Sequence, residues 1–219
     1  MRVVLFGATG MVGQGVLLEC LRDPDVERVL AVGRSATGQQ HPKLRDPVVL
    51  DVADLSGVAG ELTGLDACFF CLGVSASGLS EARYTALTYD LTLAVAQALV
   101  RASPGLTFVY VSGQGTDSTE RGRTMWARVK GRTENALQRV GFHAVYLFRP
   151  GLIVPLDGIR SRTWWYRALY AAMAPALPLL RRRFPQAVTT TAQVGRAMLA
   201  VVRRGYPTPV LEARDINTL

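Results

Sequence analysis

Three glycines near the N-terminus, Gly7, Gly10 and Gly13, lie between a short apolar run and an amphipathic pattern. Residues 3–6 predict a buried strand, and the apolar positions within 12–21 predict a helix. A strand that turns into a helix through Gly-x-x-Gly-x-x-Gly predicts a pyrophosphate-binding loop. Gly7 would permit the sharp turn, Gly10 the approach of a phosphate, and Gly13 close packing of the helix, whose free N–H groups would bind the anion. An ordinary glycine-rich turn is the alternative.

A second chemical feature is the basic residue that follows the next predicted strand, at 28–32. In NAD sites an acidic residue about twenty positions beyond the glycines binds the ribose hydroxyls. Arg34 stands there in this chain, followed by Ser35. A guanidinium can pair bidentately with a 2′-phosphate, which a carboxylate would repel. Arg34 and Ser35 therefore predict NADP in preference to NAD, with a solvated surface arginine as the alternative.

The composition is consistent with one globular domain. The chain has 219 residues, of which 49% are hydrophobic and 21 are glycine. This length can bury a sizeable core, so we predict a single domain over 1–219. The net charge of +8 indicates anionic ligands or surfaces, and it comes almost entirely from arginine, since Lys43 and Lys130 are the only lysines.

The cysteines and histidines give no sign of a metal or disulfide framework. Cys20, Cys68 and Cys71 are the three cysteines. Cys68 and Cys71 fall within an apolar run, and residues three apart in a strand face opposite sides, which argues against a redox or metal pair. We expect reduced core thiols of a cytosolic protein. His41 and His143 show no metal-ligand spacing, so no metal site is predicted.

The rest of the chain alternates predicted strands and helices without a linker or an internal repeat. Further strands are predicted at 48–50, 68–72, 106–111, 145–148 and 209–212, and further helices at 84–101, 124–140 and 191–203. This alternation predicts an α/β fold with a doubly wound parallel sheet, Rossmann-like in type. Residues 151–190 would form the substrate side. Met1 and Arg2 lead directly into the first strand, so no signal peptide is expected.

Several short motifs are spread over nearly the whole chain. They are Gly7-Ala-Thr-Gly-Met-Val-Gly13, Gly33-Arg34, Asp51-Val52, Cys71-Leu-Gly73, Tyr110-Val-Ser-Gly113, Lys130-Gly-Arg-Thr-Glu134, Arg149-Pro-Gly151 and Leu211-Glu-Ala-Arg-Asp-Ile216. With these motifs the chain resembles the atypical, extended type of short-chain dehydrogenase/reductase, a superfamily that includes NAD-dependent epimerase/dehydratase-like proteins. Within it, the chain is most similar to the Tat-interacting-protein-like and NmrA-like branch.

The resemblance implies a set of cofactor contacts beyond the glycines. The glycine loop adds Thr9, Met11 and Val12 to the predicted site. The other implied contacts are Asp51 and Val52 beside the adenine, Leu72 and Gly73 on the ribose side, Lys130 at the nicotinamide ribose, and Pro150 and Ile153 near the nicotinamide.

The catalytic motif departs from the pattern of the family. The resemblance implies Tyr-x-x-x-Lys on the helix after the fifth strand, with a serine at the end of that strand. Its lysine binds the nicotinamide ribose and lowers the pKa of the phenol, and the phenol protonates the substrate carbonyl. Here the matching residues are Trp126 and Lys130, and Ser112 is the serine, although Gly113 could align instead. An indole N–H donates hydrogen bonds but is not an acid near neutral pH.

Three interpretations of Trp126 stay open. In the first, Trp126 contacts the substrate of an oxidoreductase, and Ser112, Tyr84 or a water supplies the proton. In the second, the protein binds NADP without turnover, as a redox-sensing or regulatory module. In the third, Trp126 only packs. We favour an oxidoreductase acting on a small carbonyl or apolar substrate of unknown identity, because Lys130 and the glycine loop are both present.

Residues 160–183 are aromatic and apolar in the middle and basic at both ends. The apolar part is short for a membrane span and is interrupted by Pro175 and Pro178. A substrate lid is our preferred interpretation, and an interfacial membrane anchor is the alternative. Arg181–Arg183 could meet nucleic acid, but no recognition element accompanies them, so no such partner is expected. We predict a monomer or homodimer in the cytoplasm, peripheral at the inner face of the membrane if the anchor interpretation holds.

Overall fold

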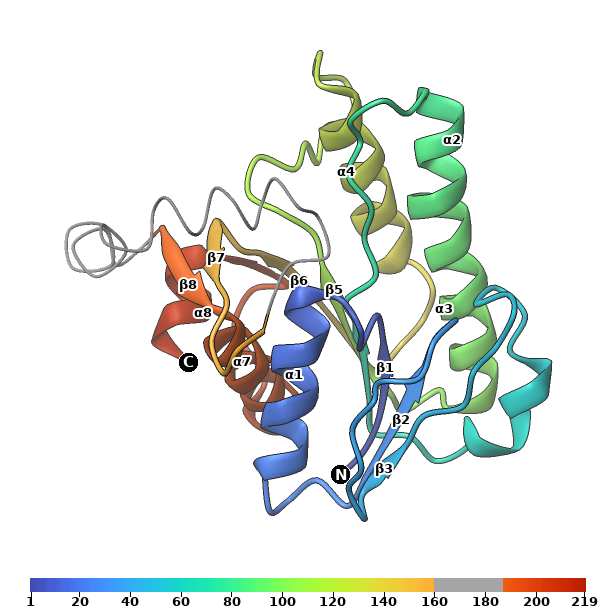
Figure 1. Cartoon of the computed structure of the whole chain (residues 1–219). Helices are drawn as coiled ribbons and strands as arrows, with labels where there is room; N and C mark the ends of the chain where they lie inside the picture. The colour runs from blue at the N-terminus through green and yellow to red at the C-terminus, as the bar shows by residue number, and fades with distance from the viewer. Residues whose placement is uncertain (160–186) are drawn as a thin grey trace.

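In the computed structural model, the chain is described over residues 1–159 and 187–219. Its centre is a seven-stranded parallel sheet in the order β3-β2-β1-β4-β5-β6-β9 (Figure 1). The strands are β1 (Arg2–Phe6), β2 (Arg28–Val32), β3 (Leu44–Arg45), β4 (Ala67–Phe70), β5 (Thr107–Val111), β6 (Ala144–Arg149) and β9 (Val210–Glu212). The prediction of a doubly wound α/β sheet is confirmed.

Helices cover both faces of this sheet (Figure 1). Those on one face are α1 (Met11–Arg22) and α7 (Thr191–Arg204), and a short α8 (Ala213–Thr218) ends the chain. The other face carries α2 (Glu81–Thr85), the π-helical turn η2 (Ala86–Asp90), α3 (Leu91–Ala102) and α4 (Met125–Leu137). A 3₁₀ helix, η1 (Ser56–Glu61), precedes β4.

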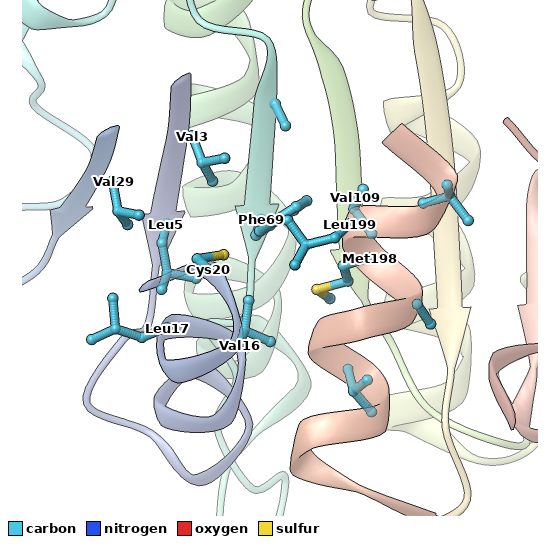
Figure 2. Close-up of a cluster of buried hydrophobic side chains, with 14 of the residues drawn as sticks. Val3, Leu5, Val16, Leu17, Cys20, Val29, Phe69, Val109, Met198 and Leu199 are labelled. Atoms are coloured by element: carbon cyan, nitrogen blue, oxygen red, sulfur yellow. The ribbon is translucent and has the colours of Figure 1, made fainter. Parts of the chain in front are cut away.

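The core is divided by the sheet into two apolar layers. Alternate residues of a strand face opposite sides, so Leu5 of β1 packs toward α1 and α7, whereas Phe6 packs toward α3. Figure 2 shows the first layer, in which Val16 of α1 and Met198 of α7 lie over Phe69 of β4. Burial on both faces explains why the central strands read as continuous apolar runs.

Glycines allow α1 and α7 to approach each other closely. A Cβ added to Gly15 would lie 2.5 Å from the Cβ of Thr191, and one added to Gly195 would lie 2.9 Å from the Cγ of Glu19. Both distances are shorter than any ordinary carbon contact. The two helices therefore meet nearly backbone to backbone, which fixes α1 and the turn that precedes it.

The third predicted strand is wrong in position. The strand expected at 48–50 lies instead at Leu44–Arg45, and Val48 makes only an isolated bridge with Gly33. Leu50 is 99% exposed. This segment runs along the sheet edge, where few partners are available, and Pro47 has no N–H to donate to a neighbouring strand. The apolar run at 48–50 therefore does not form a strand.

A small second sheet was not predicted. It pairs β7 (Leu152–Val154) with β8 (Val188–Thr190) in parallel. Both strands lie within residues 151–190, the stretch expected to form the substrate side, near its two ends. The lid or anchor predicted at 160–183 lies outside the described residues. Within residues 1–159 and 187–219, no helix is both long and apolar enough to span a membrane.

The three cysteines are free and unbridged. Cys68 belongs to the apolar layer facing α3, whereas Cys71 packs against the layer facing α1. Their opposite orientation is as predicted. Burial raises the pKa of both thiols, and among the described residues no group of three His, Cys, Asp or Glu side chains could hold a metal ion.

Candidate functional site

The turn between β1 and α1 has the geometry that its glycines predicted. Gly7 has φ +83°, and a Cβ added there would lie 2.8 Å from the backbone of Cys71. The Gly10 N–H donates to the Gly7 carbonyl at 2.9 Å, which closes the turn. A Cβ on Gly13 would lie only 2.0 Å from the Gly7 oxygen. Any side chain at Gly13 would therefore force α1 away from the strand.

The first turn of α1 is available to an anion. Gly10 is the N-cap residue, and neither a capping side chain nor an acidic residue satisfies the first turn. The exposed N–H groups and the helix dipole favour negative charge at this end. The close approach that the glycines permit is the one a pyrophosphate needs, so the residues present fit a dinucleotide.

A cavity of about 910 Å³ lies beside this turn, at the carboxyl ends of the strands. Most of the predicted cofactor residues line it. They are Gly7, Thr9, Gly10, Met11, Arg34, Ser35, Asp51, Val52, Leu72 and Gly73. The predicted contacts Val12, Gly13, Lys130, Pro150 and Ile153 are not among its lining residues. The cavity therefore gathers the residues assigned to the pyrophosphate and the adenosine, but not those assigned to the nicotinamide.

Arg34 is exposed at the mouth of this cavity, beside Ser35 and Thr37. Thr37 is held by Asp46, whose carboxylate accepts bonds from the Thr37 N–H and hydroxyl, both at 2.8 Å. Within the described ranges, the Arg34 guanidinium has no ion pair. It is therefore free to meet an added anion.

Sequence reasoning missed one wall of the cavity. This wall is a single helical face formed by Arg83, Ala86, Leu87, Asp90, Leu91 and Ala94. Their spacing follows the helical period, and this periodicity could have revealed a shared face. It could not have shown that the face borders a cavity rather than the core. Arg83 adds a second guanidinium without an ion pair among the described residues.

Ser112 lies at the end of β5, where a catalytic serine was expected. Its Oγ is 2.8 Å from the Oγ1 of Thr116, and Thr116 donates its own hydrogen to the Gly113 carbonyl at 2.8 Å. A hydroxyl has one hydrogen, so Ser112 must be the donor in its bond with Thr116. The Ser112 hydroxyl can accept a hydrogen bond from a ligand, but its hydrogen is already engaged.

Trp126 and Lys130 lie one turn apart on α4, as predicted. Trp126 is half-buried, and its indole lies against the loop after β5, 3.6 Å from the position of a Cβ on Gly115. The Lys130 Nζ lies 5.4 Å from the centre of the Tyr110 ring. Burial lowers the pKa of Lys130 to about 8, although Glu134 opposes this shift.

A buried ion pair fixes α4 beneath these residues. Glu134 is 1% exposed and pairs with Arg149 of β6, which donates through Nε at 3.1 Å and also binds Ser118. A Cβ on Gly131 would lie 1.8 Å from the Asp117 carbonyl oxygen, so the loop after β5 packs directly on the helix. The position of Lys130 relative to β5 is therefore well determined.

Tyr84, named above as a possible proton source, is only 2% exposed, and burial raises the pKa of its phenol. Tyr110 is 1% exposed, and its pKa is likewise raised by burial. Both phenols lie in the interior between the sheet and its helices. Neither can reach a substrate without rearrangement of the core.

Comparisons with known proteins bear on this site. No family model matches the chain. A curated relative, protein fmp52, mitochondrial, of Emericella nidulans, is 31% identical over 158 residues, which cover 69% of this chain and 66% of the relative. The UDP-glucose 4-epimerase of Thermotoga maritima superposes with a TM-score of 0.68 at 14% identity, covering 97% of this chain and 76% of the epimerase.

Two further structures agree. The reductase domain of PhqB from Penicillium fellutanum gives a TM-score of 0.69 at 16% identity, covering 97% of this chain and 66% of that one. The enzyme WbmF of Bordetella bronchiseptica, in complex with NAD⁺, gives 0.67 at 14% identity, covering 99% and 76%. The chain has the Rossmann-like fold of short-chain dehydrogenase/reductases and epimerases. The resemblance inferred from the motifs is thus confirmed at the level of this fold.

The comparisons correct one expectation about where the protein is located. We expected a cytoplasmic protein, peripheral at the inner face of the membrane if anchored. The curated relatives in Emericella nidulans, Aspergillus fumigatus and Chaetomium globosum are named as mitochondrial proteins, which contradicts that placement. The expectation rested on the absence of disulfides and of a leader pattern, and neither feature distinguishes one reducing compartment from another. The alignment spans just under two thirds of these relatives.

Proposed function

We propose that the chain binds NADP(H) and reduces a small carbonyl substrate. The observation that carries the cofactor assignment is the junction of the Gly7–Gly13 turn with a cavity that has Arg34 at its mouth. The N-terminus of α1 would bind the pyrophosphate. Arg34 and Ser35 would bind the 2′-phosphate, and no acidic residue occupies the position that would bind a free ribose hydroxyl.

The rest of the cofactor would extend along the carboxyl ends of the strands. Asp51 and Val52 would flank the adenine, and Leu72 and Gly73 would border its ribose. Beyond the cavity, Lys130 would hold the nicotinamide ribose. Pro150 and Ile153 would lie beside the nicotinamide itself, near the small sheet of β7 and β8.

The bound NADPH would supply a hydride to the substrate carbon. The residues of this chain would orient the substrate and handle the proton. Trp126 would form a flat apolar surface beside the reacting centre. The Ser112 oxygen would accept a hydrogen bond from the ligand. The Lys130 ammonium, which has no ion pair among the described residues, would provide positive charge where negative charge develops on the carbonyl oxygen.

NADPH oxidation in the presence of aldehydes, ketones and quinones tests this proposal. Steady oxidation of NADPH by the purified protein with at least one carbonyl substrate is the expected result. Binding should be measured in parallel by calorimetry, because it separates loss of cofactor from loss of chemistry.

A second candidate function is an NADP(H)-binding regulatory module without turnover. Two features favour it: the resemblance implies that Trp126 stands at the position of the usual acid, and the Ser112 hydrogen is already engaged. Intact NADPH binding without oxidation across the whole panel would support this function. Assembly as a monomer or homodimer stays a prediction from the sequence.

A further inference from the structure

Carbonyl reduction needs a proton for the oxygen as well as a hydride for the carbon, and the usual donor is missing here. The position of the phenol on α4 is occupied by Trp126, which contacts the loop at Gly115. Its indole N–H is not an acid near neutral pH. If the chain is the reductase proposed above, another group must supply the proton.

The candidate hydroxyl groups within residues 1–159 and 187–219 do not meet this need. Ser112 donates its only hydrogen to Thr116, whose own hydrogen is directed to Gly113. Tyr84 and Tyr110 are buried, with pKa values raised by that burial. Neither phenol is accessible to a substrate that approaches the end of β5.

The nearby carboxyl groups are equally unsuitable as acids. Glu134 is buried, and both of its carboxylate oxygens accept hydrogen bonds from Arg149. Asp117 accepts hydrogen bonds from Thr119 and Gly122, and these bonds lower its pKa. An ionised carboxylate has no proton to give.

Lys130 is the remaining proton carrier in the described part of this site. It lies one helical turn from Trp126, on the same side of α4. Its Nζ lies over Tyr110 at 5.4 Å and has no hydrogen bond or ion pair with any described residue. Contact with an aromatic face stabilises an ammonium less fully than water or a carboxylate does. The ammonium is therefore only partly satisfied and can donate to a ligand.

We propose that Lys130 itself delivers the proton to the substrate oxygen, in place of the tyrosine that this chain lacks. The carbonyl carbon accepts a hydride from NADPH, and the C=O electron pair moves to the oxygen. An N–H bond of the Lys130 ammonium breaks as the O–H bond forms. The products are the alcohol, NADP⁺ and a neutral amine, which regains a proton from solvent.

The electrostatic surroundings of Lys130 are compatible with this role. Burial lowers the pKa of the ammonium to about 8, close to the working pH that favours general acid catalysis. Glu134 on α4 raises it, but Arg149 on β6 neutralises much of that charge. Tyr110 on β5 and Tyr84 on α2 are neutral phenols. Two other charged groups of α4 form separate contacts, Arg128 with Glu81 of α2 and Arg132 with the Tyr89 ring of η2.

The chain offers a direct test, because it contains two lysines. Protein labelled with ¹³C at lysine Cε gives two side-chain resonances, and the α-amine is not labelled. The Lys43→Arg variant assigns them. We expect the Lys130 resonance of the cofactor-free protein to titrate near pH 8. Titration of Lys130 above pH 10, as in an ordinary lysine, would overturn the proposal without any measurement of turnover.

Kinetics provide the second test. Lys130→Arg keeps the positive charge but cannot release a proton near neutral pH. We expect its kcat to fall by about 10²–10⁴-fold, as for loss of a general acid, with the Kd for NADPH changed less than about threefold. The kcat of the parent protein should fall tenfold per pH unit above about 8. Lys43→Arg is the matched control, since the Lys43 Nζ binds the Asp23 carbonyl at 2.6 Å, away from this site.

The outcomes separate this inference from the function on which it rests. If the parent protein turns over and Lys130→Arg retains most of its kcat, Lys130 is not the acid, but the reductase proposal stands. If Lys130 titrates near pH 8 and the parent never oxidises NADPH, the reductase proposal fails, and the catalytic role fails with it.

Discussion

The two ends of the site differ in what they are made of. Around the turn before α1, the ligand surface is mainly backbone, and the important residues are glycines that leave space. Around the end of β5, the surface consists of side chains that are bonded to neighbours, as Ser112 is to Thr116 and Glu134 to Arg149, with the Lys130 ammonium as the exception in the described part of the site. In the first region, the missing side chains of the glycines leave room for a ligand. In the second region, contacts between side chains hold the surface in place.

This difference matters for function. A backbone cradle tolerates little change, because any Cβ at Gly13 collides with the main chain. A site built from side chains can lose its usual proton donor and still catalyse a reaction if another group donates the proton. The most informative variants therefore change either the space that the glycines leave or the groups that could donate a proton.

The largest effect is expected from Trp126→Tyr. This change restores a phenol one helical turn from the Lys130 ammonium, the pair that the resemblance implies. General acid catalysis contributes on the order of 10²–10⁴-fold, and this range is the upper limit for the rise in kcat, because the proposed Lys130 ammonium already supplies a proton in the parent protein. The measurement is NADPH oxidation with the same panel of carbonyl compounds. A fall in activity would show instead that the indole is needed as a contact surface for the substrate.

Gly13→Ala tests the backbone cradle. The added Cβ would lie 2.0 Å from the Gly7 oxygen, so α1 must shift or the turn must open. Overpacking of this kind costs about 3 kcal/mol of unfolding free energy, and NADPH binding should be lost with it. Gly57→Ala is the control, because a Cβ there meets nothing within 4 Å. Equal denaturation midpoints and equal NADPH affinities for the two variants would remove Gly13 from the cradle.

The sequence was informative where the chemistry is local. A buried strand, three glycines and a helix fall within residues 2–22, and their spacing alone predicted the turn. The third strand could not be placed in this way, because its pairing depends on the sheet edge and on Pro47. The commitment of the Ser112 hydrogen was also unpredictable, since it depends on the rotamer of Thr116 four residues away. The lowered pKa of Lys130 depends on the burial of its side chain between α4 and β5, which no spacing reveals.

Arg34→Asp tests the cofactor choice at the binding end. A charge-assisted pair with a 2′-phosphate contributes about 1.5–3 kcal/mol, so the parent should bind NADPH roughly tenfold to a hundredfold tighter than NADH. The aspartate would repel the phosphate and accept hydrogen bonds from free ribose hydroxyls, which should reduce or reverse the preference. Calorimetry with both cofactors measures it, and equal affinities in the parent protein would contradict the assignment of Arg34. Arg121→Asp, in the exposed loop before α4, controls for the change in net charge.

The smallest effect is expected from Asp117, which organises the loop between β5 and α4. Its carboxylate accepts bonds from the Thr119 hydroxyl at 2.6 Å and the Gly122 N–H at 2.6 Å, and these bonds lower its pKa. Because the pKa of Asp117 is lower in the folded than in the unfolded protein, its carboxylate stabilises the loop fully at pH values above the unfolded-state pKa. This stabilisation is lost as the pH falls through the folded-state pKa. The Gly122 amide should thus stay protected from hydrogen exchange at pH 5 and lose protection below about pH 3.8. In Asp117→Asn the protection should be weaker and independent of pH. This loop packs on Gly131 and places Gly115 near Trp126. A parent protein without this acid transition would therefore mean that α4 alone holds the end of the site beside β5.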